Sequence, residues 1–284
     1  MNSFEKNITF VIVSFKSSHI IEQCIKSINP DIKIIIVENS DDTHIKNYLE
    51  NKFLNVEVII AKDNLGYGKG NNLGISKVNT QYVFVLNPDT ILAKNCLKEL
   101  YKAQVMLRGD FAILAPNLLN NYGYFSNQNN NFKKSILDVD YVKGFAMLIN
   151  LKKVTFKKIF DENFFLFLEE IDLCKRIKNK GEKIFIVKES KVRHLAKQAS
   201  GNSLNIELCR NWHWMWSLFY YNHKHFGVWR AYRVTIVKFI SSVIKLLFAV
   251  ILFNKKFFLI HYFRLSGLLN AFLKKTAWLR PNKI

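Results

Sequence analysis

The sequence predicts an α/β fold: a Rossmann-like, mostly parallel β-sheet with helices on both faces, followed by a helical C-terminal region. Its first half contains short apolar, β-branched runs of strand length at residues 8–15, 32–37, 56–61 and 82–86. Between the first two runs, residues 20–28 carry apolar side chains at the spacing of an amphipathic helix. Nearly continuous apolar strands joined by helices are typical of parallel sheets covered on both faces. Ligands bind such sheets beyond the carboxyl ends of the strands.

The composition predicts a folded chain with one catalytic domain, residues 1–205, and a helical appendage, residues 206–284. With 284 residues the chain is long for one ordinary domain, and its 49% apolar and 14% aromatic residues exclude a disordered protein. The cysteines Cys24, Cys96, Cys174 and Cys209 form no Cys-x-x-Cys pair, which argues against a zinc ribbon and suits a reducing cytosol. We expect no signal peptide, because the first residues lack a basic and apolar leader pattern.

The positive charge is concentrated in the C-terminal region. Residues 206–284 hold 13 Lys and Arg against one acid, a net charge of +12 out of +20 for the chain, together with all five tryptophans. A basic, Trp-rich, apolar region predicts first a surface for anionic lipid and second a surface for nucleic acid. Because no common nucleic-acid-binding motif is present, we expect no nucleic-acid partner.

Residues 234–253 are apolar over the length of a membrane span. Thr235, Lys238, Ser242 and Lys245 form one polar stripe on this helix, and a central Lys costs about 2.5–3.5 kcal/mol to insert. A helix lying in the membrane interface is therefore favoured, with aromatic residues between 212 and 232 at the headgroup level. A true span, a packed soluble helix or a homodimer contact are the alternatives.

The second half of the predicted domain contains further elements. Residues 117–131 predict a loop over the site. Residues 141–150 and 164–180 form a second block that Gly181 ends as a helix stop, and residues 184–187 predict one more short strand.

A glycine-rich stretch, residues 64–72, follows the third predicted strand and leads into a helix. Gly66 and its neighbouring glycines would let the backbone approach a phosphate, while Asn64, Lys69 and Asn71 would supply polar and charged groups. The stretch matches neither a dinucleotide-binding fingerprint nor a P-loop. A tight turn with Asn caps is the structural alternative.

The fourth strand ends in Asn87-Pro88-Asp89, a Pro turn that we expect to be exposed. One carboxylate at a strand's carboxyl end suits Mg²⁺ or Mn²⁺ that also binds substrate phosphates. A plain Pro-Asp turn is the alternative.

Three acids, Glu169, Glu170 and Asp172, crowd the start of a predicted helix. Helix N-termini favour acids and Asp172 can pair with Arg176, but a third acid is a candidate general base. His194 follows about twenty residues later; alone it would more often be a core or surface histidine.

Together these motifs resemble glycosyltransferase family 2, and within it the rhamnosyltransferase-like branch that builds bacterial surface polysaccharide such as O-antigen. The resemblance covers about residues 8–200. Its marks, in the family's order, are Val13-Ser14-Phe15, residues 36–40, residues 64–72, residues 86–90, Gly144, Phe160-Asp161-Glu162 with residues 164–177, and His194.

The resemblance implies a GT-A fold and an inverting, metal-assisted displacement. It places Asp89 and His194 at a Mg²⁺ or Mn²⁺, with Asn87 where the family's Asp-x-Asp motif has its first acid. Glu170 matches the general base, usually Asp, so that Glu169 and Asp172 remain possible.

For the donor, the resemblance matches Glu38 to an acid that binds the uracil or thymine base. Ser14, Phe15 and Gly144 complete the implied donor site, together with Asn64, Gly66, Lys69, Asn71 and Asn87.

The resulting expectation is a hexosyltransferase, peripheral on the inner face of the cell membrane. Its donor would be a nucleotide-diphosphate sugar, first dTDP-rhamnose, and its acceptor a membrane-associated glycan or a polyprenyl-diphosphate-linked glycan. A catalytically inactive GT-A-like module that only binds nucleotide sugars is the alternative.

Overall fold

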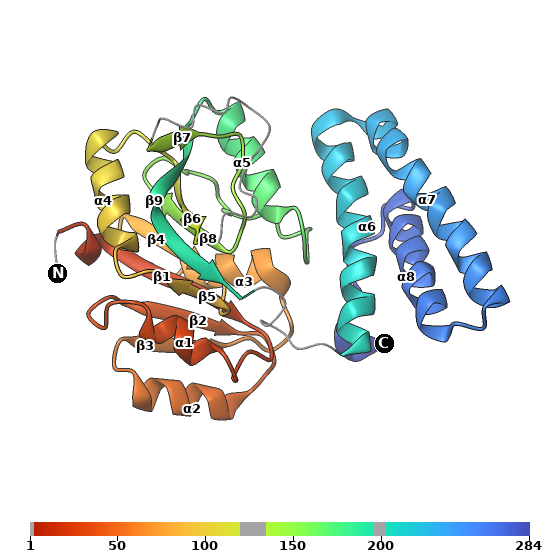
Figure 1. The fold of residues 1–284 in the computed structure, drawn as a ribbon, viewed down its shortest axis with the longest axis horizontal. Coiled ribbons are helices and arrows are strands. Elements are labelled where there is room, and N and C mark those ends of the chain that lie inside the picture. The colour runs from red at the N-terminus through yellow and green to blue at the C-terminus, as the bar shows by residue number, and fades with distance from the viewer. Residues whose placement is uncertain (1–2, 120–134, 196–202) are drawn as a thin grey trace. The chain divides into compact units, whose positions relative to one another are not determined.

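The computed structural model describes residues 3–119, 135–195 and 203–284, which form two compact units (Figure 1). The first consists of Met1–Phe160 and Glu170–Ser200, and the second of Asp161–Glu169 and Gly201–Ile284. The chain therefore enters the second unit for nine residues, returns to the first, and enters the second again. No sequence pattern indicates this excursion.

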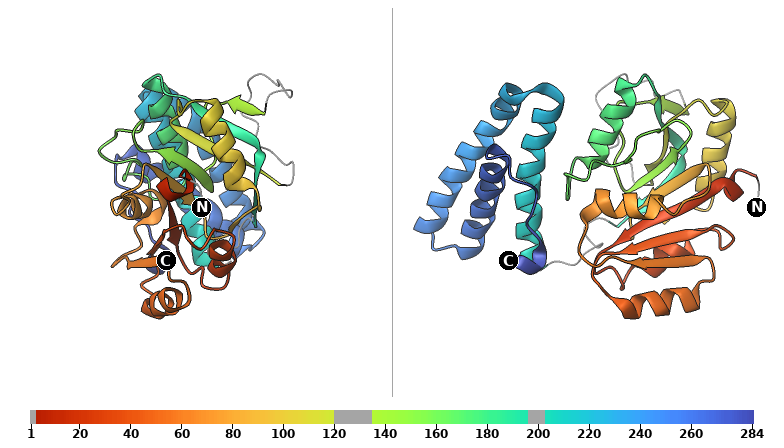
Figure 2. Two further views of the ribbon diagram at one scale, coloured as in Figure 1. Left: turned by 90° about the vertical axis from the view of Figure 1, so that its left-hand side faces the viewer. Right: turned by 180° about the vertical axis from the view of Figure 1, so that it is seen from behind.

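The first unit begins with the parallel strands that the apolar runs predict. They are β1 (Ile8–Ser14), β2 (Ile34–Glu38), β3 (Val56–Ile60) and β4 (Tyr82–Leu86), in the spatial order β3-β2-β1-β4. The connecting helices are α1 (Ile21–Lys26), α2 (Thr43–Lys52) and α3 (Gly66–Ile75), preceded by the short helix η1 (Glu5–Asn7). β1, β2 and β4 are buried almost throughout, because helices cover both faces of the sheet. The views in Figure 2 show these layers.

The second half of the sheet is mixed. β8 (Ala146–Asn150) runs antiparallel to β4 and to β6 (Ile113–Leu118), and β9 (Ile184–His194) runs parallel to β6. β5 (Thr90–Leu92) and β7 (Ile136–Asp138) pair antiparallel with β9. The helices here are α4 (Cys96–Met106) and α5 (Glu169–Asn179). Among the described residues, six of the nine strands share one direction, which confirms the predicted α/β class with a mostly parallel sheet.

Three elements differ from the sequence expectation. β9 extends to His194, beyond the predicted residues 184–187, because its polar second half pairs with β5 and β6. Asn117 and Leu118 end β6 instead of starting a loop, and residues 120–131 of that predicted loop lie outside the described residues. α5 begins only at Glu169, because Phe167 and Leu168 adopt left-handed backbone conformations with φ of 72° and 68°.

The second unit contains the helices α6 (Leu204–Phe226), α7 (Val228–Ile251) and α8 (Lys255–Phe272), followed by η2 (Pro281–Lys283). The segment Asp161–Glu169 packs against α6: Phe165 lies over the His213 ring, and Ser217 Oγ donates a hydrogen bond to the Leu166 carbonyl at 2.8 Å.

The aromatic residues that we expected at a membrane surface are divided between core and surface. Trp212 and Trp216 are buried in the core of the second unit, whereas Trp229 is 85% exposed. The buried indoles donate hydrogen bonds to Ser266 and to the Lys275 carbonyl, which satisfies their N–H groups. Only part of this aromatic cluster is therefore available to a headgroup region.

Candidate active site

The candidate site begins at the carboxyl ends of the central parallel strands. Ser14 and Glu38 end β1 and β2 and are direct neighbours in register, and both are buried. Glu38 Oε1 accepts a hydrogen bond from the Ser40 amide at 2.6 Å, which fixes the carboxylate at the strand end. Phe15 follows Ser14, and its amide lies 3.3 Å from Ser17 Oγ. The sheet therefore presents a polar edge where sequence reasoning places the donor.

The glycine-rich stretch is mostly helix and not an open loop. α3 begins at Gly66, whose φ of 76° favours glycine and whose amide donates to Asn64 Oδ1 at 3.0 Å. Asn39, next to Glu38, donates to the Gly66 carbonyl at 3.1 Å and so joins the turn to the strand edge. Asn71 is fully buried and donates to the Tyr67 carbonyl within the helix.

The glycines within α3 allow close packing. A Cβ at Gly74 would lie 2.5 Å from a methyl group of Val11 on β1, so that only glycine lets the helix approach the sheet this closely. Lys69 is exposed on α3 and is the charged group of this stretch at the surface. The stretch therefore has a packing role in addition to any contact with a ligand.

Asp89 and His194 come together although 104 positions separate them. β5 pairs with β9 so that Thr90 lies opposite His194, and the Leu195 amide donates to the Asp89 carbonyl at 2.9 Å. His194 Nε2 lies 3.2 Å from Asp89 Oδ1, and the imidazole stacks on the Phe145 ring at 4.6 Å. Asp89 is only 2% exposed, so the expectation of an exposed turn is wrong: β5 and β9 cover it.

These two side chains fit a divalent cation that is shared with a substrate phosphate. Asp89 Oδ1 is buried and accepts no hydrogen bond within the described residues, although His194 Nε2 lies 3.2 Å away; a cation or proton between these two groups would offset the cost of burying the carboxylate. Within residues 3–119, 135–195 and 203–284, no group of three or more His, Cys, Asp or Glu could hold a metal ion by itself. Mg²⁺ and Mn²⁺ bound with phosphates need only one or two protein ligands, so the pair meets this requirement.

Asn87 ends the turn on the other side. Its amide donates to the Phe145 carbonyl at 2.9 Å, and its carbonyl lies 3.5 Å from Cys24 Sγ. These backbone contacts hold the Asn-Pro-Asp turn between β8 and α1. Asn87 therefore fixes the backbone of this turn through its own amide and carbonyl groups.

The structure distinguishes the three acids at the start of α5. Asp172 is fully buried, and Arg176 Nε donates to its carboxylate at 2.8 Å, which confirms the predicted pair. Arg176 also bonds the Ile159 carbonyl, so this ion pair ties α5 to the preceding loop. Glu169 is also buried, at 3% exposure, and is the last residue of the second unit's segment. Among the three, only Glu170 is partly exposed.

The environment of Glu170 suits a proton acceptor. Burial of the carboxyl group raises its pKa, while the backbone amides of Glu170 and Ile171 and the charge of Lys143 oppose the shift. A carboxylate with a raised pKa is a stronger base than a carboxylate with the ordinary value. It is ionised at neutral pH only if the opposing groups limit the rise in its pKa.

Tyr67 and Gly144 connect Glu170 to the glycine-rich stretch, and sequence reasoning missed Tyr67. The Tyr67 hydroxyl donates to the Gly144 carbonyl. A Cβ at Gly144 would lie 3.1 Å from that hydroxyl and 3.4 Å from Glu170 Cβ, so the glycine leaves room for both side chains. The position of Tyr67 between two glycines was the only available signal, and it did not distinguish a site residue from a core aromatic.

The chain is similar to known glycosyltransferases. The family model described as Glycosyl transferase family 2 matches residues 9–164. The low-salt glycan biosynthesis hexosyltransferase Agl10 of Haloferax volcanii is 26% identical over 193 residues, covering 60% of this chain and 61% of that protein. The rhamnosyltransferase WbbL of Escherichia coli K12 is 24% identical over 210 residues, covering 62% and 79%. The match therefore spans less than two thirds of the length of the Haloferax protein.

Solved structures share the fold. GalNAc-T7, crystallised with UDP, GalNAc and Mn²⁺, superposes with a TM-score of 0.56 at 15% identity, covering 78% of this chain and 51% of that one. S. aureus TarS 1–349 superposes with a TM-score of 0.55 at 12% identity, covering 95% and 92%. These likenesses confirm the predicted GT-A fold.

Proposed function

This chain belongs to glycosyl transferase family 2, and we propose that it is an inverting, metal-dependent glycosyltransferase that uses a nucleotide-diphosphate sugar. The observation that carries the proposal is the Asp89–His194 pair at the carboxyl edge of the parallel strands, beside the buried ends of β1 and β2. This is the edge at which open α/β sheets bind ligands.

In the proposed site the donor lies along the strand ends. Glu38 would accept a hydrogen bond from the nucleobase; Ser14 is its neighbour in sheet register, followed by Phe15, and Asn64 precedes α3. Asp89 and His194 would hold Mg²⁺ or Mn²⁺, which supplies positive charge to the leaving diphosphate. The GalNAc-T7 structure contains UDP and Mn²⁺, and a second TarS structure contains UDP, which supports testing these ligands first.

Glu170 would act as the general base. The acceptor hydroxyl oxygen attacks the anomeric carbon, the bond from that carbon to the diphosphate oxygen breaks, and the hydroxyl proton passes to the Glu170 carboxylate. One displacement inverts the anomeric centre, and it needs no covalent intermediate on the protein. Gly144 would leave room for the base, and the Tyr67 hydroxyl would fix the backbone of Gly144 beside it.

The names of the relatives support a hexosyl donor, and dTDP-rhamnose is the first to test because one relative is a rhamnosyltransferase. The proposed acceptor is a glycan, free or linked to a polyprenyl diphosphate, in cell-surface polysaccharide synthesis. The low-salt glycan biosynthesis role of the Haloferax protein supports this class of product.

We place the acceptor at a membrane surface because of α7. Among the described residues it is the one helix that is long and apolar enough to cross a membrane, judged by length and composition. The helix buries Thr235 and Ser242 of its polar stripe, whereas Lys245 of the same stripe is exposed. Its opposite face exposes large apolar side chains: Ile236, Val237, Ile240, Ile244, Leu247, Phe248 and Ile251. An apolar outer face with basic residues at both ends fits the interface of an anionic membrane.

The first experiment measures donor binding and transfer with and without Mn²⁺. We expect a nucleotide sugar to raise the melting temperature of wild type in a metal-dependent way, because a bound ligand stabilises the folded state. Asp89→Asn should lose both metal-dependent stabilisation and transfer. Asp31→Asn is the matched control, because Asp31 precedes β2 and so belongs to the other edge of the sheet.

The outcomes separate the two candidate functions. Transfer that persists in Asp89→Asn, or in wild type with a chelator, would overturn the metal assignment. Donor binding by wild type without transfer to any glycan acceptor would favour the inactive, nucleotide-sugar-binding module.

Membrane binding by α7 is better tested with substitutions on its exposed face than with a truncation of the chain near residue 205. Truncation would also expose Asp161–Glu169, which packs within the second unit. Ile240→Ser with Ile244→Ser should reduce sedimentation with phosphatidylglycerol vesicles, whereas Leu54→Ser, 99% exposed on the first unit, should not. A wild-type dimer that the double variant abolishes would assign this face to a second copy of the chain instead.

A further inference from the structure

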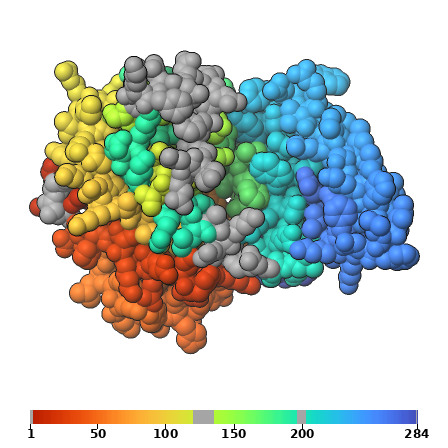
Figure 3. Space-filling model, in the orientation of Figure 1, coloured from red at the N-terminus to blue at the C-terminus, as the bar shows by residue number. Residues whose placement is uncertain are grey.

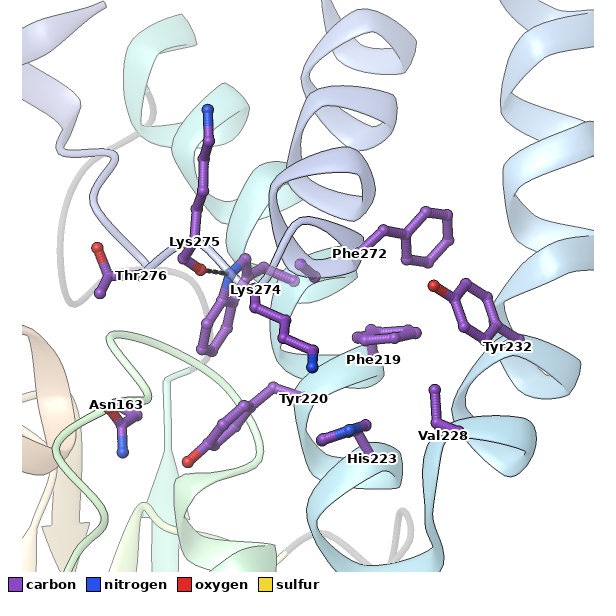
Figure 4. A pocket seen from close by; sticks show the side chains of 12 residues that line it. Asn163, Phe219, Tyr220, His223, Val228, Tyr232, Phe272, Lys274, Lys275 and Thr276 are labelled. Carbon is purple, nitrogen blue, oxygen red and sulfur yellow. Dashed lines mark hydrogen bonds between the residues drawn. The ribbon is translucent and has the colours of Figure 1, made fainter.

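The second unit contains a cavity of about 230 Å³, formed by α6, α7, the end of α8 and the residues after it. An apolar cavity of about 150 Å³ is already large enough for benzene. The wall is mainly aromatic and apolar: Trp216, Phe219, Tyr220, Val228, Tyr232, Ala271 and Phe272. Figure 4 shows Phe219, Tyr220, Val228, Tyr232 and Phe272 of this wall around a common space.

The polar lining of the cavity is cationic. Of the twelve residues that line it, all within the described part of the chain, His223, Lys274 and Lys275 are basic and none is acidic. The Lys274 side chain extends between Phe219, Tyr220 and His223 in Figure 4, whereas the Lys275 side chain points away from them. Lys274 is a solvent-exposed residue whose ammonium group lies beside an aromatic space with no acid in the lining, which fits an anionic ligand group.

A carboxylate that contacts the lining residue Tyr220 is already paired. Asp161 accepts hydrogen bonds from Lys224 Nζ at 2.7 Å and from the Tyr220 hydroxyl at 3.0 Å. Asp161 therefore lies next to a positive charge of its own, the Lys224 ammonium group. The net character of the cavity remains apolar with a positive end.

The cavity is also continuous with the apolar surface of α7. Val228 and Tyr232 line it from the first two turns of α7 and are themselves 39% and 37% exposed. An apolar chain that lies against the outer face of α7 could therefore enter at this end. The volume fits one chain and a small headgroup better than a two-chain phospholipid.

We propose that this cavity binds a single-chain lipid phosphate, with its apolar chain against Phe219, Tyr232 and Phe272 and its phosphate at Lys274. Polyprenyl phosphates and diphosphates are lipids of this class. Binding of the lipid phosphate does not depend on the proposed function. The additional idea that such a lipid carries the acceptor glycan does rest on the proposed function.

The test is equilibrium dialysis of radiolabelled farnesyl phosphate with the full chain, without donor. A chelator is present throughout, so that phosphate held through a metal at Asp89 makes no contribution. We expect farnesyl phosphate to bind at least about tenfold more tightly than either farnesol or inorganic phosphate, because only it fills the cavity and reaches Lys274.

Two pairs of variants locate the binding. Lys274→Gln should weaken it about tenfold, whereas Lys256→Gln, an exposed lysine that pairs with Glu207, should not. Val228→Trp should fill the cavity and weaken binding without changing a charge. Val237→Trp, on the exposed face of α7 but outside the cavity lining, is its control.

The inference is overturned if farnesol binds as tightly as farnesyl phosphate, if inorganic phosphate binds equally well, or if each variant binds like its control. Binding that is lost equally in Val228→Trp and Val237→Trp would assign the lipid to the α7 surface and not to the cavity. Donor binding by wild type gives a separate readout: its failure would remove the proposed enzymatic function and leave the lipid site intact.

Discussion

Replacing Glu170 by Gln removes a basic oxygen and preserves the size of the side chain. Glu170 is the partly exposed acid at the start of α5, and its Cβ lies close to the place where a Cβ at Gly144 would be. Loss of a positioned general base lowers turnover by about 10²- to 10⁴-fold. Donor affinity should change little, because Glu38 and the metal ligands Asp89 and His194 lie on β2, in the turn after β4 and on β9, and not on α5.

The raised pKa of Glu170 gives this prediction a pH dependence. Only the deprotonated carboxylate accepts a proton, so wild-type turnover should rise with pH through a pKa above the usual glutamate value. Lys143 lowers this pKa by its charge, so Lys143→Met should move the acidic limb of the profile to higher pH. Glu170→Gln should have no such limb.

The neighbouring acids provide the controls. Asp172 is fully buried and bonded to Arg176, whose side chain is 18% exposed. Breaking a buried pair by removing one partner costs about 3–5 kcal/mol, and the partial exposure of Arg176 favours the lower limit. Asp172→Asn should therefore lower the free energy of unfolding in urea by about 3 kcal/mol, whereas Glu170→Gln should leave it nearly unchanged.

Turnover and unfolding are measured for Glu169→Gln, Glu170→Gln and Asp172→Asn side by side, with turnover taken only on the folded fraction. If Glu170→Gln turns over like wild type while a stable Glu169→Gln or Asp172→Asn is inactive, the base is assigned to the wrong residue. If Asp172→Asn is as stable as wild type, the reasoning about the buried pair fails.

Three other predictions test packing and pH. Gly144→Ala should lower turnover and leave the fold intact, because its Cβ would press on the Tyr67 hydroxyl at 3.1 Å; unchanged kcat and KM would contradict this. Gly267→Ala should destabilise the helical unit by about 1–3 kcal/mol in thermal unfolding, since its Cβ would lie 2.3 Å from the Trp212 backbone carbonyl oxygen and helix backbones must separate. Burial opposes ionisation of Asp161, but hydrogen bonds, first from Lys224, outweigh it and lower its pKa. Its stabilising contribution is therefore present above the pKa of the unfolded state and is lost as the pH falls through the lowered value, so Asp161→Asn should reduce stability at pH 7 by more than at pH 3.

The sequence by itself determined the parallel strands and the order of the motifs. The apolar runs at residues 8–15 and 82–86 predict β1 and β4 to within one residue, because burial on both faces requires nearly continuous apolar side chains. The runs at residues 32–37 and 82–86 likewise place Glu38 at the end of β2 and Asp89 in the turn after β4. The Asp172–Arg176 pair follows from helical spacing alone. All of these features depend on neighbours within a few positions.

The tertiary structure decided which distant segments meet. His194 reaches Asp89 only because β5 pairs with β9, and the polar residues of β9 carry no periodic signal for that pairing. The stripe of Thr235 and Ser242 is buried because α6 and α8 cover it, whereas a single helix cannot show which face its partners occupy. The cavity around Lys274 likewise arises from helices that are far apart in the sequence. The periodicity of apolar residues indicates whether one face of a helix or strand is buried. Long-range packing decides which other element covers that face.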